Sequence, residues 1–248
     1  MIKGILFDIG STLMYFDGKF EDADARGSAA VIAHLNAQKI SVPSDFPARF
    51  LEQRKMGWKR AEETLIECTV ADALAQTLEQ LGVGARDGVV TRAVEIYFAQ
   101  AENSWHAYPD AVATLQTLRA RGYRVGAISN ADDVGIVHRA CARLEFAPYL
   151  DPIRSSAEEP RWRKPDPKIF QWAAKLWNLP PREIAYVGDA PRYDIVGAHR
   201  AGMRAILIDR GDNAAWQKIP DDKVNDPEWQ ADAVVEELTE VPTTVSSW

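Results

Sequence analysis

Cysteine is scarce in this sequence: Cys68 and Cys141 are the only two among its 248 residues. Two cysteines without a second pair support neither a disulfide framework nor a cysteine-based zinc cluster. We therefore expect both to be buried thiols of a protein that works in a reducing compartment.

Long apolar runs are missing as well. No segment approaches the roughly 18 consecutive apolar residues that a membrane-spanning helix needs. The first residues carry one lysine and only a short apolar run before Asp8, which is unlike a secretory signal. From these two absences we expect a cytoplasmic protein that does not associate with membranes.

An excess of basic residues is the third absence. The 29 lysines and arginines are outnumbered by 36 acidic residues, which gives a net charge of -7, and they form no long basic tract. Nucleic acid is therefore not expected as a partner. Apolar residues make up 46% and charged residues 26%, as in ordinary globular proteins. At about 100–200 residues per domain, the length allows one large domain or two modest ones.

What the sequence does contain is an alternation of short apolar runs with helical patterns. The runs cover residues 2–9, 123–129, 184–188 and 204–208, with a weaker one at 233–235. Nearly continuous apolar runs of this length are typical of parallel strands buried on both faces. Helical periodicity appears between them, at residues 112–121, 167–177 and 193–201. The alternation predicts α/β units around a parallel sheet.

Residues 16–104 differ from the rest because they show helical patterns and no convincing strand. Four helices are predicted, at residues 20–38, 46–63, 67–81 and 87–103. We therefore predict a core domain formed by residues 1–15 and 105–248, interrupted by an all-helical domain at 16–104. The two ends of such an insertion should lie close together, so that the sheet closes as though it were absent. The end of the chain, residues 240–248, is rich in Thr and Ser and is expected to fray.

Polar side chains stand where the predicted strands end. They are Asp8, Ser129, Asn130, Asp189 and Asp194. Lys164 lies in a loop directly before a predicted helix. In open parallel sheets, ligands bind beyond the carboxyl ends of the strands. These side chains are therefore predicted to converge on one rim of the sheet.

This set of side chains suits phosphoryl transfer. The carboxylates of Asp8 and Asp189 are hard oxygen ligands of the kind that Mg²⁺ binds, and the ion would offset the repulsion between an attacking carboxylate and an anionic phosphate. A carboxylate nucleophile forms an acyl phosphate, which splits one difficult displacement into two. Lys164 would hold phosphate and nucleophile together, while Ser129 and Asn130 would donate hydrogen bonds to phosphoryl oxygens.

Four motifs give the sequence its resemblance to a known family. They are FDIGSTL at residues 7–13, AISN at 127–130, RKPDPKIF at 163–170 and GDAPRYDIVGAHRAG at 188–202. In order and spacing they resemble the motifs of the haloacid dehalogenase superfamily of hydrolases, in the branch with a helical cap inserted after the first strand. The resemblance covers nearly the whole chain, and the cap is its least specific portion.

The resemblance implies a Rossmann-like, three-layer α/β core and a role for each motif residue. It makes Asp8 the nucleophile and Lys164 the charge clamp, with Ser129 and Asn130 as phosphate contacts. The implied magnesium ligands are Asp8, the carbonyl of Gly10, Asp189 and Asp194, the last of them directly or through water. The implied substrate is a small phosphate monoester. Its identity and the oligomeric state stay open at this point.

One position departs from the pattern of the family's phosphatases. They usually carry a second aspartate two positions after the nucleophile, which protonates the leaving oxygen and later activates water, and here that position is Gly10. The next residue, usually glycine, is Ser11. Loss of a general acid–base group typically costs about 10²–10⁴-fold in rate, so we expect magnesium binding together with slow turnover. Asp17 follows in the loop that leads to the cap, but such loop acids are usually only solvated.

Three functions fit these residues. The first is a Mg²⁺-dependent phosphatase for small phosphate esters, slow or restricted to good leaving groups. The second is a 2-haloacid dehalogenase, in which Asp8 would displace halide, a group that leaves without protonation; the family's dehalogenases also lack the second aspartate. They work without metal, however, and lack the pair formed by Asp189 and Asp194, which favours the phosphatase because clustered acids need a cation. The third is a catalytically weak member that binds a phosphorylated ligand or a protein.

Basic residues crowd one predicted helix of the cap around Trp58. They are Arg54, Lys55, Lys59 and Arg60. A run of charges is usually a solvated helix face, and we prefer this interpretation to contact with an anionic substrate.

Overall fold

The computed structural model describes residues 1–83, 87–212 and 214–248. Its centre is a six-stranded sheet in the order β5 (Ile153–Ser155), β4 (Arg124–Ser129), β1 (Gly4–Phe7), β6 (Ile184–Gly188), β7 (Arg204–Ile208) and β8 (Ala233–Val235). All neighbouring pairs are parallel. The predicted Rossmann-like α/β fold is confirmed, and five strands lie where the apolar runs placed them. The edge strand β5 is the one that sequence reasoning missed.

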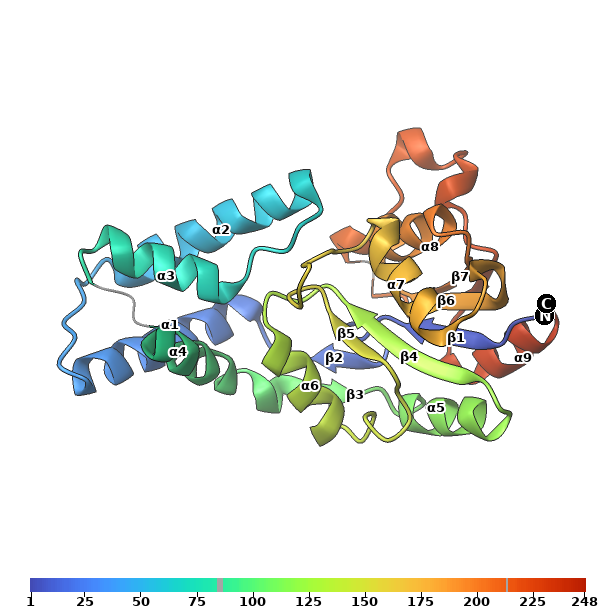
Figure 1. Ribbon diagram of the computed structural model, residues 1–248, viewed down its shortest axis with the longest axis horizontal. Coiled ribbons are helices and arrows are strands. Elements are labelled where there is room, and N and C mark those ends of the chain that lie inside the picture. The colour runs from blue at the N-terminus through green and yellow to red at the C-terminus, as the bar shows by residue number, and fades with distance from the viewer. Residues whose placement is uncertain (84–86, 213) are drawn as a thin grey trace.

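Helices cover both faces of the sheet and give three layers (Figure 1). One face, with Ile5 and Phe7 of β1, packs against α5 (Ala111–Ala120), α6 (Val134–Arg143) and α9 (Val241–Ser246). The opposite face, with Leu6 and Tyr186, packs against α7 (Pro167–Trp177) and α8 (Val196–Arg200). Because neighbouring side chains of a strand point to opposite faces, the single apolar run of β1 supplies both layers.

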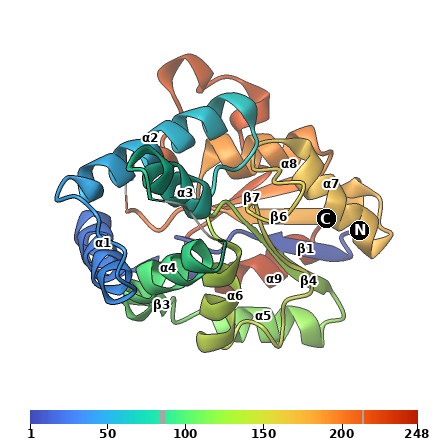
Figure 2. The ribbon, with the colours of Figure 1, turned by 60° about the vertical axis from the view of Figure 1, so that its left-hand side comes forward.

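The inserted segment forms four helices of its own. They are α1 (Phe20–Ala37), α2 (Phe46–Thr64), α3 (Val70–Gln80) and α4 (Asp87–Ala99), and they share a separate hydrophobic core. Figure 1 shows this group of helices projecting from one end of the sheet, and Figure 2 shows the same group turned toward the viewer. We refer to residues 16–104 as the cap. No helix in the described part of the chain is both long and apolar enough to cross a membrane.

A short antiparallel ribbon joins the two ends of the insertion. β2 (Met14–Phe16) pairs with β3 (Trp105–Ala107), with Tyr15 opposite His106. The prediction that these ends lie close together is therefore confirmed. The predicted boundaries between core and cap, at 15/16 and 104/105, fall at this ribbon.

Two helix predictions and one prediction about the end of the chain are corrected by the structure. The helix predicted from residue 67 begins at Val70, because the side chains and main-chain N–H groups of Thr69 and Asp72 cap each other reciprocally. The helix predicted at residues 193–201 begins as a π-helical turn, Pro191–Ile195, and continues as α8. The end of the chain does not fray, since Val241 and Val245 of α9 are buried in the core beside α5.

Single turns of 3₁₀ helix complete the connections. They lie at Glu102–Ser104, Pro181–Glu183, Ala215–Gln217, Asp221–Lys223, Pro227–Trp229 and Leu238–Glu240.

Candidate active site at the carboxyl edge of the sheet

Three adjacent strands deliver predicted site residues to one edge of the sheet. β1 leads into Asp8, β4 ends at Ser129, and β6 leads into Asp189. Because these strands are parallel neighbours, their carboxyl ends lie side by side. The three residues line one cavity of about 190 Å³, and the other predicted site residues line it too, namely Gly10, Asn130, Lys164 and Asp194.

Lys164 occupies the centre of the site. Its ammonium donates to Oδ1 of Asp8 at 2.8 Å and to Oδ1 of Asp194 at 2.6 Å. A third hydrogen bond, of 2.9 Å, runs to the hydroxyl of Tyr186, which itself donates to the carbonyl of Ile128. The lysine is only 2% exposed. Three partners for three donors fix the ammonium between the two carboxylates.

Asp8, Asp189 and Asp194 form a cluster of buried carboxylates. One oxygen from each lies within 4.8 Å of the others, and none of the three residues is more than 8% exposed. Lys164 offsets one of their three negative charges, which leaves a surplus of two. A compact set of oxygen ligands with this surplus is suited to one hard divalent cation.

Burial and neighbouring charges shift the pKa values of Asp8, Asp189 and Lys164. Burial raises the pKa of Asp8 to about 6, although Lys164 acts in the opposite direction. Burial, followed by the charges of Asp8 and Asp194, raises the pKa of Asp189 to about 7. Burial alone would lower the pKa of Lys164, but Asp194 and Asp8 outweigh it and raise that pKa, so the lysine stays charged. Without a cation, burial therefore disfavours the charged forms of Asp8 and Asp189.

Uncharged groups donate hydrogen bonds to one oxygen, Oδ2, of Asp189 and of Asp194. Oδ2 of Asp189 accepts from the indole N–H of Trp216 at 2.9 Å and from the side-chain amide of Gln217 at 3.2 Å. Oδ2 of Asp194 accepts from the main-chain N–H of Ala190 at 2.9 Å. Both oxygens of Asp194 are therefore bound by the protein, since Oδ1 accepts from Lys164, whereas the donors to Asp189 bind only its Oδ2.

Asn130 has a structural task in addition to its place in the cavity. Its side-chain Nδ2 donates to the carbonyl of Lys164 at 2.9 Å, and its Oδ1 accepts from the N–H of Lys164 at 2.8 Å. This reciprocal pair holds the loop that carries the lysine. Ser129 and Asn130 both line the cavity, and their contact with phosphate stays a prediction.

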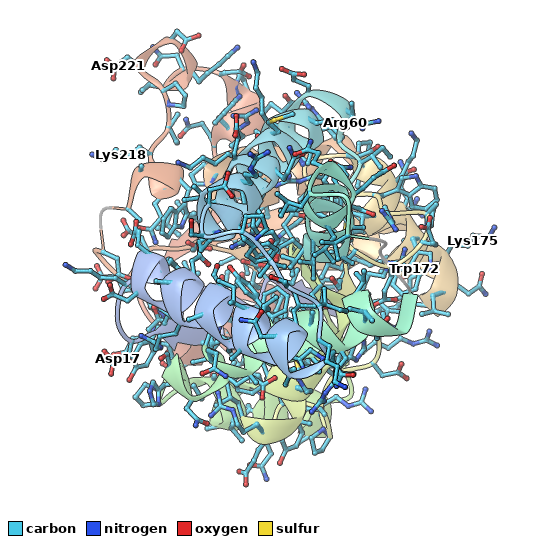
Figure 3. The ribbon with its side chains drawn as sticks, turned by 90° about the vertical axis from the view of Figure 1, so that its left-hand side faces the viewer. Asp17, Arg60, Trp172, Lys175, Lys218 and Asp221 are labelled. Carbon is cyan, nitrogen blue, oxygen red and sulfur yellow. The ribbon has the colours of Figure 1, made fainter. Side chains whose placement is uncertain are left out.

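The loop after β1 leaves room at the position that departs from the family pattern. A Cβ placed on Gly10 would meet only Cη2 of Trp105, at 4.0 Å, and the φ of Gly10 is not left-handed. The left-handed residue here is Ser11, with a φ of 56°. Asp17 is exposed and does not line the cavity (Figure 3), so it is not placed to replace the missing acid.

The cap contacts the loops that carry the lysine and the acids. Glu62, near the end of α2, accepts a hydrogen bond of 3.1 Å from the hydroxyl of Tyr193. It also forms ion pairs with Arg163 at 3.0 Å and with Arg192 at 3.1 Å. Arg163 directly precedes Lys164, and the other two partners lie between the two acids that follow β6. One cap carboxylate therefore binds both loops.

The solvated face predicted for α2 needs one correction. Lys55, Lys59 and Arg60 are exposed, and Arg60 is labelled in Figure 3. Arg54 is 8% exposed, and its guanidinium pairs with Asp24 of α1 at 2.8 Å and with Asp132 of the core at 3.1 Å. The prediction was wrong for Arg54 because two carboxylates from other elements compensate its charge where α2 meets them.

Sequence reasoning missed three residues of the site. The signal for Tyr186 is a hydroxyl inside the apolar run that precedes Asp189, because a buried tyrosine hydroxyl needs a hydrogen-bond partner. Trp216 and Gln217 lie in a segment without periodicity after β7, and nothing in their local sequence indicates contact with Asp189.

Comparisons with known proteins show the family of the chain. Residues 2–202 match the family model of haloacid dehalogenase-like hydrolases. A glyceraldehyde 3-phosphate phosphatase of Methanopyrus kandleri is 30% identical over 228 residues, which cover 91% of this chain and 92% of that protein. The (S)-2-haloacid dehalogenase 4A of Burkholderia cepacia is 26% identical over 85% of this chain and 81% of its own. The crystal structure of a 2-haloacid dehalogenase from Pseudomonas syringae pv. Tomato DC3000 superposes with a TM-score of 0.72, 25% identity and full coverage of both chains.

Proposed function

The chain belongs to the haloacid dehalogenase-like hydrolases, and we propose that it hydrolyses small phosphate monoesters with the help of one divalent cation, Mg²⁺. In this proposal Asp8 attacks phosphorus, the alcohol leaves, and an aspartyl phosphate forms on Asp8. Water then cleaves the aspartyl phosphate and releases inorganic phosphate. The 30% identity to a glyceraldehyde 3-phosphate phosphatase supports the proposal.

The observation that carries the proposal is the charge of the carboxylate cluster. Asp8, Asp189 and Asp194 bring three negative charges to within 4.8 Å, and Lys164 supplies one positive charge. An isolated buried charge is costly, so two uncompensated carboxylates would either take up protons or bind a cation. A divalent cation restores neutrality, and a doubly charged phosphate then has a positive partner to approach.

The donor set of the cluster fits Mg²⁺, because every available ligand atom is oxygen. The carboxylates of Asp8, Asp189 and Asp194 would hold the ion, together with the carbonyl of Gly10, which needs no side chain for this task. When bound, the ion supplies positive charge that lowers the repulsion between the nucleophile and the phosphoryl oxygens.

The protein's own groups orient the reacting atoms. Lys164 holds Oδ1 of Asp8, which leaves Oδ2 as the oxygen proposed to attack. Its raised pKa keeps it positively charged, so it also attracts the phosphate. The hydrogen-bond pair with Asn130 keeps the lysine in place during the reaction. Ser129 is the proposed donor to a phosphoryl oxygen.

The leaving alcohol receives no proton from position 10. Gly10 has no side chain, and Asp17 lies outside the cavity. The alcohol therefore takes its proton from water, which restricts efficient turnover to groups that leave easily. The proposed enzyme acts readily on aryl phosphates and slowly on alkyl phosphates.

A 2-haloacid dehalogenase is the second candidate, and two observations favour it. One is the likeness to dehalogenases in sequence and structure, and the other is Gly10, since halide leaves without a proton. Against it stands the surplus of two buried negative charges, which a metal-free reaction would leave uncompensated. A third candidate, a member that binds a phosphorylated ligand without turnover, requires only the metal and the phosphate contacts.

A hydrolysis screen separates these candidates. The protein is incubated with p-nitrophenyl phosphate and with 2-chloropropionate, each in Mg²⁺ and in excess chelator. Phosphate release that needs Mg²⁺ and disappears in Asp8→Asn supports the proposal. Chloride release that is insensitive to the chelator establishes the dehalogenase instead. If neither product forms while Mg²⁺ still binds, the binding function is the correct one.

A further inference from the structure

A second cavity lies between the cap and the catalytic cavity. It measures about 370 Å³ and shares Asn130 with the catalytic cavity. Asp24, Arg54 and Trp58 of the cap line one side of it, and Asp132 and Arg163 of the core line the other. If phosphate sits beside Asp8 and Lys164, the group attached to it extends into this space. We call it the leaving-group cavity.

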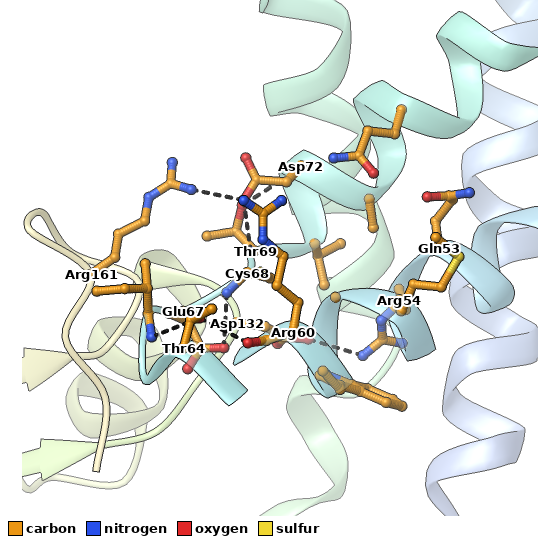
Figure 4. A pocket seen from close by; sticks show the side chains of 17 residues that line it. Gln53, Arg54, Arg60, Thr64, Glu67, Cys68, Thr69, Asp72, Asp132 and Arg161 are labelled. Carbon is orange, nitrogen blue, oxygen red and sulfur yellow. Dashed lines mark hydrogen bonds and ion pairs between the residues drawn. The ribbon is translucent and has the colours of Figure 1, made fainter. Parts of the chain in front are cut away.

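The positive charge of Arg54 in this cavity is already compensated by two carboxylates. Its Nη1 pairs with Oδ1 of Asp24 at 2.8 Å, and its Nη2 pairs with Oδ2 of Asp132 at 3.1 Å. The guanidinium also lies 4.7 Å from the ring centre of Trp58. Figure 4 shows the contact of Arg54 with Asp132 at an adjoining cavity of about 550 Å³, which is also lined by Arg54, Trp58 and Asp132.

The other guanidinium of the cavity is compensated as well. The side chain of Arg163 is 11% exposed and pairs with Glu62 at 3.0 Å and with Glu67 at 3.7 Å. Glu67 is itself 3% exposed and lines the cavity. Two arginines therefore face three lining carboxylates, those of Asp24, Glu67 and Asp132. Even with Glu67 protonated, positive charge does not exceed negative charge.

Two carboxylates of the cavity keep an oxygen that can still accept a hydrogen bond, although their charges are paired with Arg54. Asp24 and Asp132 each give one oxygen to Arg54, and no described residue donates to the second oxygen of either. The cavity thus offers carboxylate acceptors, which suit a leaving group that donates hydrogen bonds, such as a hydroxyl group.

We infer that the leaving group of the substrate carries no negative charge and donates hydrogen bonds to Asp24 and Asp132, the carboxylates that hold Arg54, and that esters with a carboxylate in this position are rejected. A carboxylate there would have to displace an existing ion partner of an arginine or lie unpaired beside like charge. The inference rests on the proposed phosphatase function, since phosphate is what places the leaving group in this cavity.

Three two-carbon phosphate esters that differ only in their terminal group test the inference. They are 2-hydroxyethyl phosphate, phosphoglycolate, which ends in a carboxylate, and phosphoethanolamine, which ends in an ammonium. Each is measured as a competitive inhibitor of p-nitrophenyl phosphate hydrolysis in Mg²⁺, so that slow turnover does not hide binding. We expect 2-hydroxyethyl phosphate and phosphoethanolamine each to bind about tenfold or more better than phosphoglycolate.

Single substitutions then test the assigned residues. Asp132→Asn removes the negative charge of one partner of Arg54 and is expected to improve phosphoglycolate relative to 2-hydroxyethyl phosphate by about fivefold or more. Asp24→Asn should act in the same direction, which protects the test if one variant is unstable. The matched control is Asp22→Asn on the exposed side of α1, which should leave the preference unchanged.

Failure of the inference differs from failure of the proposed function. If phosphoglycolate binds as well as or better than the other two esters while p-nitrophenyl phosphate is hydrolysed, the phosphatase stands and the inference is overturned. The inference is equally overturned if the preference is the same in wild type, Asp132→Asn and Asp24→Asn. If p-nitrophenyl phosphate is not hydrolysed, the phosphatase fails, and calorimetric titration with the same three esters still ranks them.

Discussion

Replacing Gly10 by aspartate introduces the acid–base group that this site lacks. A Cβ at position 10 would meet only Cη2 of Trp105 at 4.0 Å, which is ordinary contact, and the backbone there is not left-handed. The substitution is therefore sterically permitted. It brings a carboxyl group to the cavity beside Asp8, on the loop that follows the nucleophile.

The expected gain follows from the chemistry of the first step. A positioned general acid contributes about 10²–10⁴-fold, or roughly 3–5 kcal/mol, when the leaving oxygen needs a proton. An alkyl alcohol needs that proton, whereas p-nitrophenolate leaves without it. Gly10→Asp should therefore raise kcat/KM for an alkyl phosphate about 10²-fold or more and change kcat/KM for p-nitrophenyl phosphate by less than about threefold.

The assay compares the two esters in saturating Mg²⁺ for wild type, Gly10→Asp and Gly10→Asn. Since kcat/KM reports steps up to formation of the aspartyl phosphate, the later hydrolysis does not affect the comparison. Gly10→Asn has the same size without the acid and should show no gain. An unchanged or lower ratio of alkyl to aryl activity in folded, Mg²⁺-binding Gly10→Asp would refute this account of the missing acid.

Three further predictions concern the cluster and the cap. The folded pKa of Asp189, about 7, exceeds its ordinary value of 3.8. The free energy of unfolding of the chelator-treated protein should therefore fall as pH rises from about 4 to 7. In urea unfolding, Asp189→Asn should make this fall less steep, and an equally steep fall in the variant would contradict the assigned cause. Gly188→Ala would place a Cβ 2.3 Å from Cγ of Asp194, so it should destabilise the protein by about 1–3 kcal/mol and lower kcat, and unaltered unfolding would show that the cluster is loosely packed. Glu62→Gln should weaken the hold of the cap on both catalytic loops and raise KM more than it lowers kcat, whereas the exposed neighbour Glu63→Gln should do neither; equal effects of the two would remove the role assigned to Glu62.

The sheet was predictable where a strand is buried on both faces. β1, β6 and β7 are almost wholly apolar, and their runs are visible without any tertiary information. β5 escaped because it has three residues and a central Arg154, whose guanidinium is buried only through hydrogen bonds to Glu158 and Glu159. The fraying expected at the end of the chain was wrong for a similar reason, since contact with α5 and not composition orders α9.

The site was predictable where its residues follow strand ends or stand in a motif. Asp8, Lys164 and Asp194 are far apart in sequence, yet they meet because the strands are adjacent and the lysine loop crosses their ends. The donors to Asp189 were not predictable, because Trp216 and Gln217 reach it only through the path of a long connection. Arg54 was misjudged because local charge density does not reveal partners on other elements.

Calorimetric titration of the intact protein with Mg²⁺ tests most directly whether the buried acids form one cation site. We predict a single ion bound per chain in the wild type, and loss of that binding in Asp189→Asn, in which one ligand is neutral and the surplus charge is halved. Absence of binding at millimolar Mg²⁺, or equal binding by the wild type and Asp189→Asn, would contradict the account.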